Sequence, residues 1–121
     1  MTYIDFTETS VWKKSFDLLV KIYQLAKCFP KEEMYNLTSD MKRAANSVLH
    51  NFAEGFGRFE PRDKTRFYKI SRGSAYELIS QSLVARALRY IDAEDQTHLR
   101  LGYKDVIHEL DNLIISIEGK K

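Results

Sequence analysis

Six basic side chains gather between residues 58 and 72 of this chain, and their spacing is its clearest chemical signal. They are Arg58, Arg62, Lys64, Arg66, Lys69 and Arg72. Only two acids, Glu60 and Asp63, lie among them, although the net charge of the whole chain is just +2. Helical spacing places four of the six, Arg58, Arg62, Arg66 and Lys69, on one face. Phe59, Phe67 and Tyr68 lie among them in the sequence. Such a row can pair with phosphates while an aromatic ring stacks on an unpaired base. The segment indicates nucleic-acid contact, and a solvated helix face with its rings turned inward is the alternative.

The residues that could support catalysis or metal binding lack the spacing that either requires. A di-metal carboxylate bundle uses two Glu-x-x-His pairs, and no Glu of this chain has His three residues after it. His50 and Glu54 are four residues apart and Glu77 could approach them, so a mononuclear site remains an alternative to structural partners such as Arg43 or Arg72. Motifs for a nucleophilic serine or a phosphate-binding loop are also missing. We predict no enzyme activity, no catalytic residue, no metal and no cofactor.

The composition is that of a helical globular protein. The 121 residues fit one domain, 44% of them are hydrophobic, and only five are Gly and two Pro. A single cysteine, Cys28, excludes an internal disulfide. The chain opens without a signal-peptide pattern, and charged residues interrupt every apolar run before the roughly 20 residues that a membrane span needs. We therefore expect a single-domain protein of the cytoplasm with no membrane partner.

Apolar residues recur at helical spacing in four segments, which must position the basic row. We predict helices over about residues 10–28, 39–54, 61–90 and 93–118. Ser10, either Thr38 or Ser39, and Asp92 are the expected N-caps, and Pro61 suits a first helical turn. Gly55 and Gly57 are expected to end the second helix. Short connections between four helices predict an all-α, antiparallel up-down-up-down bundle.

Side-chain size predicts how two of these helices meet. The second helix carries small residues at Ala44, Ala45, Ser47 and Ala53, and the third has a small patch at residues 73–75, so a tight helix pair is expected. The expected inward row of the third helix is Phe67, Ile70, Ser74, Leu78, Gln81, Ala85 and Leu88. The first helix has two apolar rows, and three phenylalanines, at positions 52, 56 and 59, lie near one bundle end. This apolar surface favours an oligomer.

Several motifs resemble those of a known bacterial family of four-helix bundles. In the first half of the chain they are Val11-Trp12-Lys13-Lys14, Phe29-Pro30-Lys31-Glu32-Glu33, Leu37-Thr38-Ser39, Arg43-Ala44-Ala45, Ser47-Val48 and Asn51-Phe52-Ala53-Glu54-Gly55. In the second half they are Phe67-Tyr68, Gly73-Ser74-Ala75-Tyr76-Glu77-Leu78, Leu113-Ile114 and Ser116-Ile117. The family includes proteins encoded in intervening sequences of 23S ribosomal RNA genes, and the likeness covers nearly the whole chain. The chain is also similar to accessory proteins of diversity-generating retroelements.

This resemblance implies a ring-shaped homo-oligomer, with a pentamer as the expected form, and a nucleic-acid or protein partner. Two positions depart from the family pattern. Leu49-His50 stands where a Pro and a small residue are common, and Glu77-Leu78-Ile79 carries one acid where many members have two. The departure at Glu77 weakens any argument for a site built on paired carboxylates.

Two functions follow as hypotheses. The first is a non-enzymatic oligomer that displays the basic surface repeatedly and so binds structured RNA or DNA with avidity. The second is an oligomeric scaffold whose basic face recognises an acidic protein partner.

Overall fold

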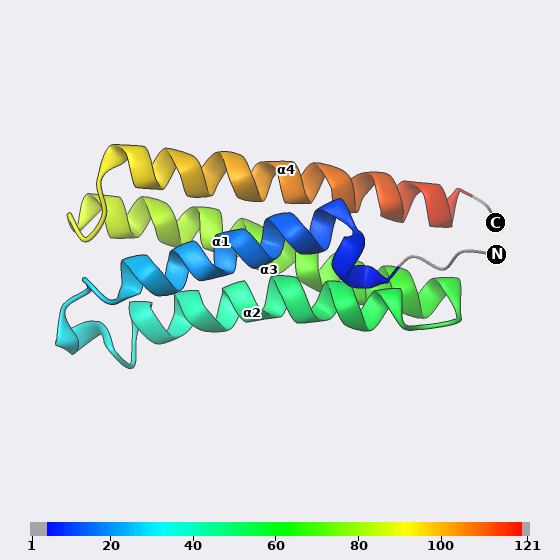
Figure 1. Cartoon of the computed structure of the whole chain (residues 1–121), viewed down its shortest axis with the longest axis horizontal. Helices are drawn as coiled ribbons and strands as arrows, with labels where there is room; N and C mark the ends of the chain where they lie inside the picture. The colour runs from blue at the N-terminus through cyan, green and yellow to red at the C-terminus, as the bar shows by residue number, and fades with distance from the viewer. Residues whose placement is uncertain (1–4, 120–121) are drawn as a thin grey trace.

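Each of the four segments with helical periodicity forms a helix in the computed structural model, which describes residues 5–119. The helices are α1 (Ser10–Ala26), α2 (Leu37–Phe56), α3 (Pro61–Ala87) and α4 (Ala93–Glu118), and the short 3-10 helices η1 (Phe6–Glu8) and η2 (Lys31–Glu33) precede α1 and α2. Figure 1 shows consecutive helices running in opposite directions along one axis. α1 and α3 each pack against both α2 and α4. The predicted all-α, up-down-up-down four-helix bundle is confirmed.

The N-caps of the helices agree only partly with those predicted from the sequence. Asp92 caps α4 as predicted, because its side chain accepts a hydrogen bond from the Asp95 amide at 2.7 Å. At α1 the cap is Thr9 and not Ser10, since the Thr9 hydroxyl accepts from the Trp12 amide at 3.3 Å. α2 begins at Leu37, ahead of both predicted caps, and Asn36 precedes it without a side-chain capping bond.

α1 and α3 end earlier than the sequence predicts. α1 stops at Ala26, and a turn leads from there to Pro30. α3 stops at Ala87 because Arg89 adopts the left-handed conformation, with φ of 66°, and the Tyr90 amide donates back to the Ala85 carbonyl at 2.9 Å. This is the usual helix-ending pattern of a left-handed residue, but glycine normally occupies that position. An arginine there gives no signal in the sequence.

The predicted tight pair is formed by α2 and α3, and small residues allow it. Ala44 and Ala45 of α2 and Ala75 of α3 are fully buried. Hydroxyl groups bridge the pair, because Ser71 donates to the Val48 carbonyl at 2.7 Å. A second bridge joins the hydroxyls of Ser74 and Ser47 at 2.8 Å. Much of the sequence that carries the family resemblance therefore builds a helix contact.

Gly55 does not end α2 but lies buried inside its last turn, and Gly57 is the residue after the helix. A Cβ atom added at Gly55 would lie 2.7 Å from the Tyr68 ring and 3.0 Å from the Lys64 carbonyl oxygen. The glycine is thus required by the close approach of α3.

The predicted inward row of α3 is partly wrong. Ser74, Leu78 and Ala85 are buried, but Ile70 and Leu88 are 43% and 50% exposed, and Phe67 and Gln81 are half-buried. The buried row consists of Thr65, Tyr68, Ser71, Ser74, Ala75, Leu78, Ser82 and Ala85. Apolar residues occur on more than one side of α3, so its periodicity did not select one row. Small serine and alanine side chains face inward because α2 lies so close.

Candidate functional site

The six predicted basic residues lie at one bundle end, on the connection from α2 to α3 and on the first half of α3. Three of them form ion pairs. Arg58 lies 3.4 Å from Glu54, Lys69 lies 2.6 Å from Glu118, and Arg72 lies 2.5 Å from Asp111. The last two pairs join α3 to α4, and all three remain partly exposed. Their charges are offset, although exposed pairs of this kind stabilise a fold only weakly.

Lys64 is directed away from the other basic residues, toward the end of α2. Its ammonium group donates to the Phe56 carbonyl at 2.8 Å and to the Gly55 carbonyl at 3.3 Å. A cation there also complements the negative end of the helix dipole. Burial lowers the pKa of Lys64 below its usual value. These contacts give Lys64 a local role as a cap on α2.

Arg62 and Arg66 are exposed on α3, and neither forms an ion pair within residues 5–119. The Arg66 guanidinium lies over the Phe67 ring, 4.5 Å from its centroid, and Arg58 lies 4.9 Å from the same centroid. Phe67 thus serves as a platform for two cations. Arg62 and Arg66 are the members of the basic row whose charge is most available to a ligand.

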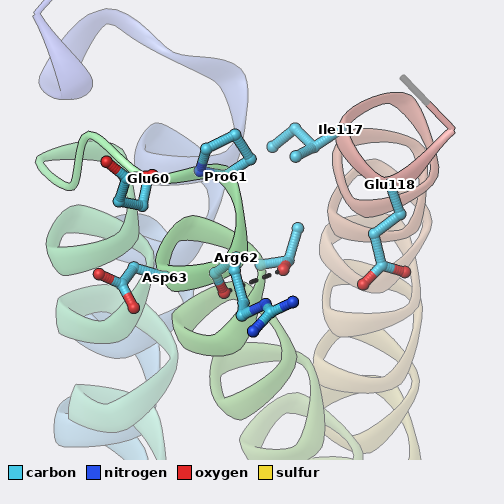
Figure 2. Close-up of a pocket in the computed structure, with 7 residues that line it drawn as sticks. Glu60, Pro61, Arg62, Asp63, Ile117 and Glu118 are labelled. Carbon is cyan, nitrogen blue, oxygen red and sulfur yellow. Dashed lines mark hydrogen bonds between the residues drawn. The ribbon is translucent and has the colours of Figure 1, made fainter. Parts of the chain in front are cut away.

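A cleft of about 530 Å³ lies beside Arg62, between the start of α3 and the end of α4. Figure 2 shows Glu60 and Asp63 on one side of Arg62 and Glu118 on the other. Three carboxylates around one guanidinium disfavour an anion inside this cleft.

The three aromatic residues of the basic segment have different environments. Tyr68 is buried and stacks on Phe52, with ring centroids 5.6 Å apart, and Phe67 is half-buried under its two arginines. Phe59, in the connection before α3, is 98% exposed. Phe59 is therefore the ring of the three that can stack on a base. No pattern in the sequence favours Phe59 over the other two rings.

The outward face of α3 changes character along its length. We call it the α3 stripe, and it consists of exposed residues Arg62, Arg66, Lys69, Gly73, Tyr76, Ser80, Leu83, Val84 and Ala87. The first three are basic, whereas the remainder are small or apolar apart from Ser80. One helix face therefore presents a charged half next to the α2–α3 connection and an apolar half toward the other bundle end.

The carboxylates considered for a metal site have other partners. Glu77 accepts from Arg43 at 2.5 Å and from the Gln81 amide at 3.2 Å, and Glu54 pairs with Arg58. Within residues 5–119 no group of three or more His, Cys, Asp or Glu side chains is placed to hold a metal ion. In the same part of the chain, every helix is too short or too polar to span a bilayer.

The fold and surface define an all-α four-helix bundle with one basic helix stripe. A family model described as 23S rRNA-intervening sequence protein matches residues 7–112, and the chain belongs to that family. None of the curated proteins matches the chain. A crystal structure of a protein of unknown function from the S23 ribosomal protein family of Bacteroides thetaiotaomicron is similar, with a TM-score of 0.79. The two are 19% identical, over 86% of this chain and 97% of that one, so this likeness concerns the fold.

Proposed function

We propose that this protein is a non-enzymatic, oligomeric, cytoplasmic bundle that binds nucleic acid through the basic half of the α3 stripe. The main observation behind this proposal is that Arg62 and Arg66 lie near the fully exposed ring of Phe59 along the chain. Neither arginine forms an ion pair in the described part of the chain. Guanidinium groups bind phosphate, and an exposed ring stacks on an unpaired base. The family description refers to intervening sequences of 23S rRNA, which makes RNA the first ligand to test.

The charge of one subunit argues for repetition. Arg58, Lys69 and Arg72 already face carboxylates, and Lys64 caps α2, so a single stripe offers few free cations. A few phosphate contacts give weak binding that salt abolishes. Several copies held in one oligomer, for which the family resemblance suggests a pentamer, would raise the effective concentration of each further contact. Assembly is therefore part of the proposal.

The role of Phe59 separates this proposal from simple charge attraction. We compare Phe59→Ala with Tyr35→Ala, a matched variant that removes another exposed ring, 87% accessible, far along the chain. Fluorescence anisotropy with nuclease-treated protein measures the affinity for single-stranded RNA and for duplex. Loss of one stacking contact should weaken single-strand binding about tenfold. Duplex binding and the Tyr35→Ala variant should change little, and equal losses for both variants would overturn the stacking role.

A protein scaffold is the second candidate, and the apolar half of the α3 stripe favours it. Tyr76, Leu83 and Val84 are each more than two-fifths exposed there. On α1, Phe16 and Tyr23 are also exposed. Apolar side chains in such numbers are typical of surfaces that contact protein. An acidic polypeptide that binds at fixed stoichiometry and competes with RNA for Arg62 would favour this function.

A further inference from the structure

A second binding site lies where the start of α1 meets the ends of α2 and α4 and the first turns of α3. A cavity of about 630 Å³ opens there, within the range of about 300–1,000 Å³ that small-molecule sites occupy. Its apolar wall includes Val11, Phe52, Phe56, Leu113 and Ile117. All four helices contribute to this wall, so the cavity is a product of the whole bundle.

Two polar groups lie in this apolar wall with hydrogen-bonding capacity to spare. Tyr68 is 4% exposed and lines the cavity, and its hydroxyl has no hydrogen-bond partner in the described part of the chain. Lys64 also lines it, and two of its three ammonium protons are used by the Phe56 and Gly55 carbonyls. The Tyr68 hydroxyl is open to the cavity, so a ligand acceptor there would replace water as its partner. One donor from each residue is therefore available.

The wall holds one cation, Lys64, and one carboxylate, Glu109. The Glu109 Oε2 lies 2.9 Å from the Lys14 ammonium, which does not itself line the cavity and also pairs with Asp105 at 2.6 Å. The Glu109 charge is thus partly offset by a lysine outside the site. Lys64 remains the cation that a ligand inside would meet.

We propose that this cavity binds a medium-chain carboxylate, with its hydrocarbon chain against the apolar wall and its head group accepting from Tyr68 and Lys64. The site is independent of the nucleic-acid surface, because Lys64 faces the end of α2 and not the α3 stripe. The sequence pattern had assigned Lys64 to phosphate binding, and this proposal assigns it to the carboxylate site instead.

Calorimetric titration of the whole protein with decanoate, below its micelle concentration, tests the proposal. We expect saturable binding of one decanoate per chain. Tyr68→Phe keeps the ring on Phe52 and should weaken binding about three- to tenfold through loss of one hydrogen bond. Leu113→Trp should fill the cavity and abolish binding. The matched control, Leu101→Trp, places the same bulk on the exposed side of α4 and should leave affinity unchanged.

Decanol tests the head group. It should bind more weakly than decanoate, and equal affinity would overturn the assignment of a carboxylate. Unsaturable binding, or wild-type affinity in Tyr68→Phe, would overturn the site itself. Should Leu113→Trp fail to fold, as judged by circular dichroism, the Tyr68→Phe titration decides the question alone.

Discussion

Two glycine substitutions test the claim that close approach of α2 and α3 organises the bundle. Gly55 and Gly73 both lie within helices, but their surroundings are opposite. A Cβ at Gly55 would lie 2.7 Å and 2.8 Å from two atoms of the Tyr68 ring, whereas one at Gly73 would have no atom within 4 Å. Changing each glycine to alanine therefore adds the same methyl group where a neighbouring side chain fills the space and where the space is open.

The expected magnitudes follow from these distances. Alanine in place of glycine stabilises a helix interior by about 0.5–1 kcal/mol, a gain that both variants share. At Gly55 the methyl group must displace a buried ring and approach the Lys64 carbonyl, and overpacking of this kind costs about 1–3 kcal/mol. Gly73→Ala should therefore raise the free energy of unfolding. Gly55→Ala should fall below Gly73→Ala by about 1–3 kcal/mol.

Urea titration followed by circular dichroism, at several protein concentrations, measures the free energy of unfolding of both variants. A difference of 1 kcal/mol corresponds to a shift in melting temperature of about 3–5 °C for a chain of this size. Equal stabilisation by the two substitutions would refute the packing argument. It would show that α3 can move away from α2 without penalty.

Two further substitutions probe buried and paired groups. The Tyr103 hydroxyl is buried without a hydrogen-bond partner in residues 5–119, so Tyr103→Phe should leave stability unchanged or raise it by up to about 1 kcal/mol at pH 7. Burial raises the pKa of Tyr103 above its ordinary value of 10.0, so above pH 10 the unfolded state ionises before the folded state does, and the wild-type protein loses stability as pH rises. Melts between pH 9 and 11 should show a smaller alkaline loss in the variant, and an equal loss would contradict the assignment. Asp111→Asn should free Arg72 from its carboxylate and raise nucleic-acid affinity about two- to fivefold in an anisotropy titration, whereas reduced affinity would contradict the proposed surface.

The sequence predicted the bundle because apolar residues recur at helical spacing in four segments and because two of the helix starts are recognisable. Pro61 and Asp92 mark two helix starts by chemistry that acts within one turn. The end of α3 at Arg89 was missed because an arginine took the backbone conformation that glycine usually adopts. Gly55 was misread as a helix end because its function depends on Tyr68, thirteen residues later in sequence, and local patterns do not contain such contacts.

The candidate site was predicted as a set of charges, but the sequence could not show which charges were free. Asp111 and Glu118 lie on α4, far from Arg72 and Lys69 in sequence, and only the packing of α3 on α4 brings the pairs together. Lys64 is a lysine of the same basic segment as Lys69, yet its ammonium group caps the end of α2. Exposure of Phe59 likewise depends on where the connection lies relative to the bundle.

The most direct test of the central claim is the salt dependence of RNA binding. The slope of log affinity against log salt counts the phosphates that the protein neutralises. Replacing both Arg62 and Arg66 by alanine should reduce this slope by about 1.4–1.8 for each engaged subunit, whereas Lys13→Ala with Lys104→Ala, which removes two exposed charges on α1 and α4, should leave it unchanged. An unchanged slope in the arginine variant, or an equal loss in the lysine variant, would contradict a nucleic-acid surface on α3.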